Sequence, residues 1–384
     1  MPEAREPAPY RSTPSPGSDD YLANELLIES SKKFDKADEA IVAANLTFGS
    51  KVTFRVKIII VTALVAVFCA SFALGKYSMN PLDLLLTLWY NLVGAYDLVD
   101  PKMELVIYNI RLPRIFVVML VGAALAMAGA SFQGMFKNPL TSPDLLGASA
   151  GASLGACIAL LLNMPGELVQ LLAFCGGMVA VGMAVWLNRY VDYDPILGLV
   201  LAGILVSTLF SSGMSLVKFM ADANDKLPTI TFWLMGSFAT INGEDFWRCL
   251  PAMILGFIIL LTQSWKLNVL SFGDEEARAM GINTGRTRLL VIFASTLITS
   301  VSVAVAGIVG WIGLVIPHLA RAIVGPNYKV LLPAAMFVGA VYLLIVDNIA
   351  RLIAPVEIPI GILTAILGVP FFVIIFKRNM KGWK

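Results

Sequence analysis

The chain of 384 residues is 58% hydrophobic and only 14% charged. A soluble protein needs more charge to wet its surface, so this composition indicates a polytopic membrane protein. The net charge of +2 comes without a basic stripe, which excludes nucleic acid as a partner. The four cysteines lie in apolar segments at irregular spacing, so we expect neither disulfides nor a metal site.

Residues 1–50 stand apart as a polar N-terminal extension. Five prolines occur by Pro16, and a mixed polar and apolar segment follows. We expect a disordered tip and then a surface helix over Asn24 to Ala44. The first long apolar run begins too late for a cleavable signal peptide. Residues 51–384 form the predicted membrane domain.

Long charge-free intervals divide the membrane domain. Most are close to the roughly 20 residues that a helix needs to cross about 30 Å of hydrocarbon. The intervals are Ile58–Gly75, Ile115–Phe136, Leu145–Gly166, Leu168–Asn188, Pro195–Val217, Cys249–Trp265, Leu289–Ala320, Val330–Val346 and Ile358–Phe376.

The interval Leu289–Ala320 is too long for one span. Its 32 residues would extend about 48 Å as a helix, which exceeds the thickness of a bilayer. Gly307, Gly310 and Gly313 mark the expected break, and Pro317 lies in the second helix. The prediction is therefore an all-α protein with ten transmembrane helices and both termini on one side of the membrane.

The distribution of lysine and arginine predicts the orientation. With the N-terminus in the cytoplasm, the cytoplasmic segments of residues 51–384 carry 15 of these residues and the outer segments carry 8. The positive-inside rule favours this topology. Two shorter apolar segments, Leu84–Tyr96 and Leu227–Gly243, would then lie at the outer face as interfacial or half-inserted helices.

We find no sequence motif for ATP hydrolysis and little sign of ion coupling in the chain. It lacks the G-x-x-x-x-G-K-[ST] phosphate loop, so we expect neither ATP hydrolysis nor a catalytic residue. Within the spans only His318 could serve a proton- or ion-coupled carrier, which usually has a carboxylate there. The clustered polar groups of a membrane enzyme are also missing. A partner ATPase is therefore favoured over an ion-coupled secondary transporter.

The segment Ser271–Arg288 carries six charges in eighteen residues between two apolar intervals. Its three acidic residues would occupy the first turn of a short helix and complement the helix dipole. Gly281 would end this helix as a left-handed cap, and Arg278 could pair with Asp274. The spacing alone fits either a solvated loop or a surface on which a partner protein acts.

Gly147, Gly151 and Gly155 recur every four residues, with small residues between them. This small-x-x-x-small ridge allows close packing of helices. The rival interpretation is a phosphate-binding loop, which needs a preceding strand of a soluble domain. We therefore expect a helix-packing role for the three glycines.

Four motifs occur in a fixed order along the membrane domain. They are RLPRIFVVMLVGAALAMAGASFQGMFKNPLTSPDLLGASAGASLGA from Arg111, GDEEARAMGIN from Gly273, GWIGLVIPHLAR from Gly310 and EIPIGILTAILGVPFF from Glu357. Together they resemble the FecCD family, the permease subunits of bacterial ABC importers for ferric siderophores, haem and vitamin B12. The resemblance extends from about Lys57 to Arg378 and leaves out the N-terminal extension.

The resemblance implies a type II ABC importer permease in the bacterial cytoplasmic membrane. The implied partners are a second permease subunit, identical or sister, a cytoplasmic ATPase dimer and an extracytoplasmic substrate-binding protein. The ATPase would bind ATP and Mg²⁺, and this chain would hold no cofactor. Coupling helices at about 267–283 would enter the ATPase through the motif residues Asp274, Glu275, Glu276, Ala277, Arg278 and Gly281.

Arg111, Arg114 and Arg351 would lie at the outer membrane surface, where isolated arginines commonly snorkel. In the vitamin B12 members of the family, arginines at matching positions face acidic residues of the binding protein. The resemblance therefore implies that these three arginines dock a binding protein. Long-range attraction to its carboxylates would raise the on-rate at low salt.

The resemblance also implies that the fifth span lines the pathway and narrows into a gate at its cytoplasmic end. Pro195, Ile196 and Leu197 stand where vitamin B12 members have small hydroxyl residues, which argues against a polar gate, although apolar side chains could also seal the pathway by dewetting. Met214 and Lys218 could meet an anionic ferric chelate, but Lys218 could equally snorkel outward. The expected substrate is a ferric siderophore, with haem or cobalamin as the alternative.

Overall fold

The computed structural model describes residues 54–75, 81–94, 99–190 and 195–380. Within these ranges the chain is built from helices and short loops, without a strand. The polar extension 1–50, with the predicted surface helix Asn24–Ala44, lies outside the described residues.

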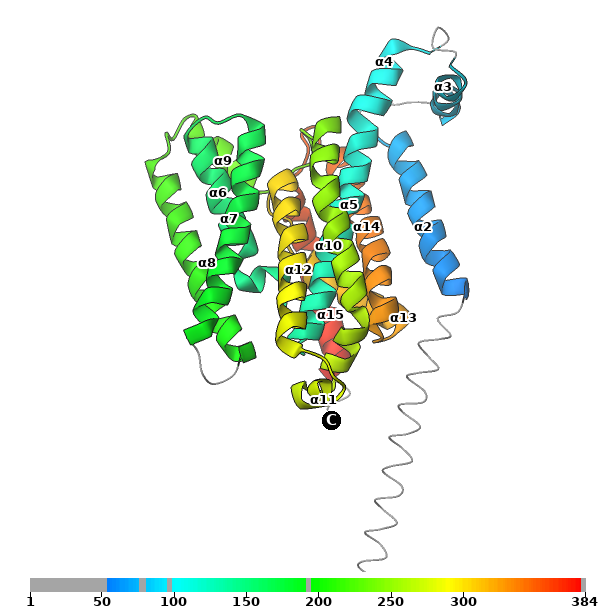
Figure 1. The fold of residues 1–384 in the computed structure, drawn as a ribbon. Helices are drawn as coiled ribbons and strands as arrows, with labels where there is room; N and C mark the ends of the chain where they lie inside the picture. The colour runs from blue at the N-terminus through cyan, green and yellow to red at the C-terminus, as the bar shows by residue number, and fades with distance from the viewer. Residues whose placement is uncertain (1–53, 76–80, 95–98, 191–194, 381–384) are drawn as a thin grey trace, which may run out of the picture. The chain divides into compact units, whose positions relative to one another are not determined.

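The helices follow one another with short connections (Figure 1). Four short elements, α4 (Pro101–Glu104), η2 (Leu105–Arg111), η3 (Pro143–Leu146) and η4 (Asn188–Tyr190), adjoin longer helices. The other helices are α2 (Phe54–Ala73), α3 (Pro81–Val93), α5 (Leu112–Met135), α6 (Ala148–Leu161), α7 (Gly166–Leu187), α8 (Pro195–Met220), α9 (Lys226–Leu234), α10 (Gly243–Leu270), α11 (Asp274–Ala279), α12 (Thr284–Ala306), α13 (Ile312–Val324), α14 (Tyr328–Leu352) and α15 (Ile360–Met380).

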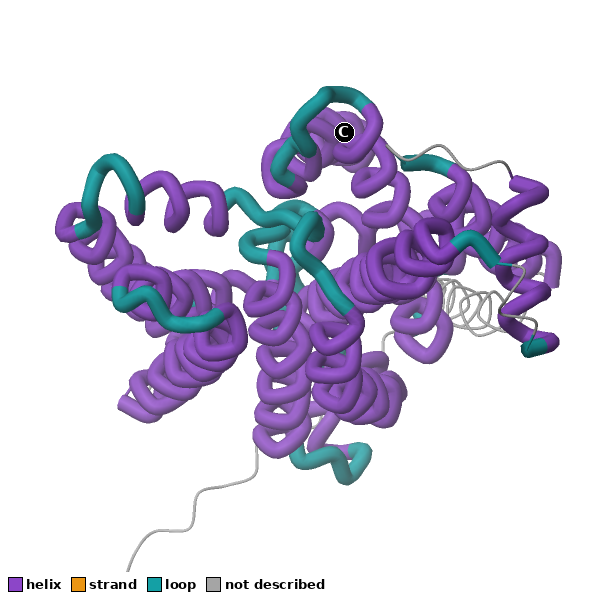
Figure 2. Tube along the Cα trace, turned by 90° about the horizontal axis from the view of Figure 1, so that it is seen from above, coloured by secondary structure: helices purple, strands orange, loops and turns teal. Residues whose placement is uncertain are grey.

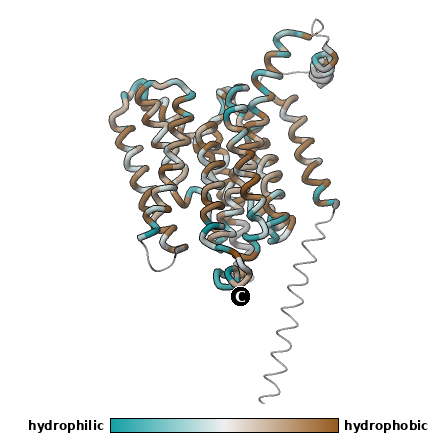
Figure 3. The backbone as a smooth tube through the Cα atoms, in the orientation of Figure 1, coloured by the Kyte–Doolittle hydropathy of each residue, from teal (hydrophilic) through white to brown (hydrophobic). Residues whose placement is uncertain are grey.

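Each predicted span coincides with one helix, which confirms the all-α polytopic class. Seven described helices are long and apolar enough to cross a membrane. Three shorter apolar helices, Ala148–Leu161, Ile312–Val324 and Ile360–Val373, occupy the other predicted spans. The count of ten crossings stays a prediction. Hydropathy in Figure 3 is high along the helices, whereas hydrophilic residues gather at helix ends and in α11.

The long helices form two groups. In the first, α5 contacts α10, α12, α13 and α14, and its middle is almost fully buried. In the second, α6 packs against α7, α8 and α9. Helix α12 contacts α5 and α10 as well as α6 and α7, so it joins the groups, which lie side by side in Figures 1 and 2.

The predicted break in the long apolar interval is confirmed between α12 and α13. Here three segments at the ends of helices meet in a loop junction, which comprises residues 235–236, 306–308 and 360–361. The Ser237 amide donates to the Ala306 carbonyl at 2.9 Å, and the Ile360 amide donates to the Gly236 carbonyl at 3.0 Å. These bonds matter because backbone groups at membrane depth have no water to satisfy them.

Close backbone contact makes a glycine necessary at the loop junction. Gly307 has a φ of 70°, which L residues with side chains rarely adopt. A Cβ atom on Gly307 would also lie 2.4 Å from the Trp233 carbonyl oxygen. The glycine cluster that predicted the break therefore contains the residue that allows it.

The bundle has two distinct ends. Helix α11 lies between the end of α10 and the start of α12 and defines the α11 end. Asn268 near the end of α10 donates to Asn327 at 2.9 Å, just before α14 begins. Helix α14 therefore starts at the α11 end and carries its last residues to the opposite end.

Candidate functional site

Helix α11 presents charge at one end of the bundle. Its first turn holds three carboxylates, and Gly281 follows with a φ of 77°, as the sequence predicts for a left-handed cap. Glu275, Glu276 and Arg278 are exposed, whereas Ala277 is buried beneath them. Two large apolar side chains flank the helix, Phe272 at 68% exposure and Met280 at 59%. The surface can thus offer a partner both charged and apolar contacts.

The ion pairs of α11 differ from the expected local pair. Asp274 accepts from Arg288 of α12 at 2.7 Å and lies 3.9 Å from Lys137, instead of pairing with Arg278. Because Arg288 is largely buried, this contact ties the short helix to α12 and leaves Arg278 exposed. A displacement of α11 would therefore pull on α12.

At the opposite end, Arg114 lies at the centre of a buried ion network. Its Nε and Nη2 atoms donate to Asp347 of α14, with Nη2 and Oδ1 separated by 2.8 Å. Its Nη1 and Nη2 atoms donate to Glu357 at 3.1 and 2.8 Å. Side-chain exposure is 7% for Arg114, 0% for Asp347 and 24% for Glu357. We call Arg114, Asp347, Arg351 and Glu357 the arginine cluster.

The other two predicted docking arginines are also engaged within the chain. Arg351 lies 3.2 Å from Asp347 across one helical turn and donates to Asn348. Arg111 donates to the Phe72 carbonyl at the end of α2. These contacts join α2, α5 and α14 at this end of the bundle.

The three arginines do not extend into solvent as isolated snorkelling side chains would, and their role in docking stays a prediction. Arg111, Arg114 and Arg351 are only 4%, 6% and 6% exposed. The reason is that α14 continues through Leu352 and the helical run that contains α5 begins at Pro101, so all three side chains face neighbouring helices.

Asp347 is an acid within a long helix that the charge-free intervals do not reveal. The predicted interval stops at Val346, one residue earlier. The i,i+4 spacing of Asp347 and Arg351 was the available signal for an ion pair. The expectation that His318 is the only ionisable side chain within the spans is therefore wrong, although Asp347 is neutralised by two arginines.

Of the predicted pathway residues, Ile196, Leu197 and Met214 differ in how far α8 exposes them. Pro195 begins the helix, Ile196 is half-buried and Leu197 is exposed. Met214 turns inward and packs near Cys157 and Val217, so it does not lie on the exposed face. That face includes three hydroxyl residues, Thr208, Ser212 and Ser215, each of which donates to the carbonyl four residues earlier.

The three glycines of the predicted ridge have two different structural roles. A Cβ atom on Gly151 would lie 2.3 Å from the Gly176 carbonyl oxygen, and one on Gly155 would lie 2.1 Å from that of Leu172. Both glycines therefore permit close contact between α6 and α7. Gly147 precedes α6 with a φ of 84° and faces Ser207 of α8, so it belongs to a turn and not to the ridge.

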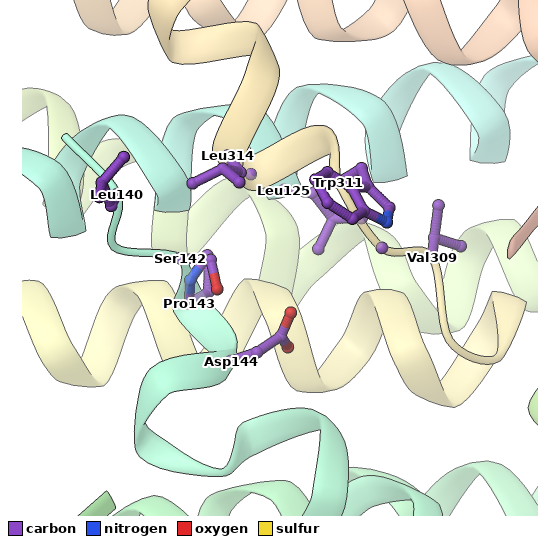
Figure 4. A pocket seen from close by; sticks show the side chains of 10 residues that line it. Leu125, Leu140, Ser142, Pro143, Asp144, Val309, Trp311 and Leu314 are labelled. Atoms are coloured by element: carbon purple, nitrogen blue, oxygen red, sulfur yellow. The ribbon is translucent and has the colours of Figure 1, made fainter. Parts of the chain in front are cut away.

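A cavity of about 280 Å³ lies beside the break between α12 and α13 (Figure 4). Its lining comes from α5, from the segment before α6 and from residues 309–314. Trp311 lines it with a φ of 70°, a strained value for a bulky residue. Asp144 also lines it and accepts from the Ser149 hydroxyl. The cavity thus adjoins the non-helical backbone between α12 and α13.

Among the known proteins that this chain resembles, the names of three state different substrates. The molybdate import permease MolB of Haemophilus influenzae is 39% identical over 85% of this chain and 95% of its own length. The Fe(3+)-citrate permease YfmE of Bacillus subtilis is 37% identical over 84% and 95%. The hemin permease HmuU of Yersinia pestis is 37% identical over 80% and 92%.

A solved structure agrees with the fold. It is described as a metal-chelate type ABC transporter in an inward-facing conformation, with 38% identity and a TM-score of 0.75. The match covers 83% of this chain and 98% of that chain. The pattern of the FecCD transport family matches residues 63–378. This chain is a multi-pass membrane protein that belongs to the FecCD transport family of ABC importer permeases.

Proposed function

We propose that the chain is the permease subunit of an importer that moves a ferric siderophore across the bacterial cytoplasmic membrane. The observation that carries the proposal is the charged helix α11, which projects between two membrane helices and is tied to α12 by the pair Asp274–Arg288. The subunit would lack an ATPase site, and its termini would be cytoplasmic. It would work beside a second permease subunit, identical or sister.

Helix α11 would be the coupling contact with a cytoplasmic ATPase dimer that binds ATP and Mg²⁺. Glu275, Glu276 and Arg278 are exposed and can meet charges on that partner, while Phe272 and Met280 supply apolar contact area. Movement of the ATPase would displace α11, and the buried pair with Arg288 would carry the displacement into α12.

The opposite end would receive the substrate-binding protein. Arg111, Arg114 and Arg351 place three positive charges there against Asp347 and Glu357, so the group keeps an excess of one positive charge. An acidic surface on the binding protein would be attracted to this excess.

The substrate class rests on the relatives. Their names cover molybdate, Fe(3+)-citrate, hemin and cobalamin, all of which contain a metal. A ferric siderophore fits this range, and haem or cobalamin is the alternative chelate. The identity of 39% to the molybdate permease, against 37% to the Fe(3+)-citrate permease, makes a metal oxyanion the second candidate.

Uptake assays distinguish these substrates. Cells that depend on this permease would be given labelled ferric siderophore in competition with ferric citrate, hemin, cobalamin or molybdate. We expect ATP-dependent uptake of the siderophore that persists when the ion gradient is collapsed. Uptake of molybdate alone would replace the chelate assignment, and uptake that follows the ion gradient would contradict the coupling role of α11.

A further inference from the structure

Glu357 is placed differently from the other members of the arginine cluster. Asp347 lies inside α14 with no exposed surface, whereas Glu357 lies on the non-helical segment 353–359 and keeps 24% of its side chain exposed. Of the two carboxylates that bind Arg114, Glu357 is therefore the one that solvent and an approaching group can reach.

Arg114 binds the two carboxylates through different atoms. The Nη1 atom serves Glu357 alone, the Nε atom serves Asp347 alone, and Nη2 serves both. Loss of Glu357 would thus leave the buried contact with Asp347 in place. A second carboxylate that took over the Nη1 side would keep the guanidinium paired, so the exchange would avoid the cost of an unpaired buried charge.

The segment that holds Glu357 leads directly into the loop junction. Three residues later, the Ile360 amide donates to Gly236, and the Gly361 amide donates to Met235 at 3.0 Å. A Cβ atom on Gly361 would lie 3.0 Å from the Ile308 carbonyl oxygen, at the break between α12 and α13. Motion of Glu357 would therefore reach the broken helix through direct backbone contact.

We propose that Glu357 is an exchangeable latch, which shields Arg114 until a carboxylate of the binding protein displaces it and thereby loosens the loop junction. This inference rests on the proposed docking of a binding protein at this end of the bundle. Through Glu357, docking of the binding protein would change the structure at the α12–α13 break, where the cavity and Trp311 lie.

Arginine labelling tests the shielding step without a binding protein. The full-length protein in lipid nanodiscs would be treated with phenylglyoxal, and the modification of each arginine would be followed by mass spectrometry. In Glu357→Ala we expect Arg114 to react several-fold faster than in the wild type. Glu167→Ala is the matched control, because Glu167 is 66% exposed and pairs with Arg248 on the surface. An unchanged rate at Arg114 would overturn the latch.

Hydrogen exchange tests the link to the loop junction. Glu357→Ala should raise exchange in 235–237, 306–311 and 360–362 together, whereas an increase confined to 353–359 would contradict the link. Glu357→Gln loses the charge but keeps the size of the side chain. We expect its hydrogen exchange to rise less than that of Glu357→Ala, and this comparison separates loss of charge from misfolding. If the binding protein bound equally well to the wild type, Glu357→Ala and an Arg114 variant, the docking role would be refuted. The labelling and hydrogen-exchange results would still support the shielding of Arg114 and its link to the loop junction.

Discussion

Gly281 combines an exposed position with a backbone conformation that restricts substitution. Its φ is 77°, and a Cβ atom added there would meet no atom within 4 Å outside its immediate neighbourhood. A side chain would therefore meet backbone strain but no clash. Asparagine tolerates this conformation, whereas valine costs about 1–2 kcal/mol or more because its branched Cβ crowds the backbone.

We predict that Gly281→Val weakens coupling between ATP hydrolysis and transport, because the end of α11 must rearrange. Gly281→Asn should retain most of the coupling, since it keeps the left-handed cap. The measurement is the ratio of transport to ATP hydrolysis in proteoliposomes with the partner ATPase. Equal ratios in the wild type and Gly281→Val would remove Gly281 from the coupling contact.

Asp347 neutralises two arginines in the interior of the bundle. In Asp347→Asn, Arg114 keeps only Glu357 and Arg351 loses its nearby carboxylate. Removal of one partner from a buried pair typically costs about 3–5 kcal/mol. We expect a large fall in the unfolding temperature of the purified protein. The control is Glu244→Gln, because Glu244 is 73% exposed and pairs with Arg248 on the surface. This variant should change the unfolding temperature little.

These residues also show where sequence reasoning ends. The charge-rich segment and the left-handed cap at Gly281 are local features, so the sequence predicts them. The Asp274–Arg288 and Arg114–Asp347 pairs join residues 14 and 233 positions apart. Such pairs depend on how helices pack, and a single sequence contains no direct record of that packing.

At the scale of helices, small residues determine how closely α6 and α7 approach. We predict that Gly151→Ala destabilises the protein, because the new methyl group would lie 2.3 Å from the Gly176 carbonyl oxygen. This clash can be relieved only if the backbones of α6 and α7 move apart. Gly182→Ala in α7 is the control, since its Cβ meets no atom within 4 Å. It should leave stability equal or raise it by about 0.4–1 kcal/mol. Thermal unfolding in detergent compares them.

The helices themselves are largely predictable from charge-free intervals, because a membrane excludes unpaired charge from its interior. Their ends are not, since paired charges extend a helix beyond its apolar interval. The helical run through α5 begins at Pro101, well before the predicted Ile115, and contains both Arg111 and Arg114. Likewise the inward orientation of Met214 follows from the packing of α8 on α6, which periodicity within α8 does not reveal.

At the scale of the molecule, the proposed mechanism requires the two charged ends to face opposite solutions. Helix α10 connects the two charged ends directly. Its 28 residues extend about 42 Å, which is longer than the hydrocarbon layer of about 30 Å. Trp247 near its start is 69% exposed, and Phe272, just after its end, is 68% exposed. These two positions therefore report on the two sides of the membrane without disturbing a buried contact.

We predict that a membrane-impermeant maleimide applied to intact cells labels Trp247→Cys but not Phe272→Cys. The background must lack the four native cysteines, since Cys69 and Cys175 are exposed. After the membrane is permeabilised, both positions should react, which shows that Phe272→Cys is accessible in the folded protein. Labelling of Phe272→Cys from outside would invert the topology. An ATPase in the cytoplasm could then no longer reach α11, and the proposed coupling and docking ends would exchange places.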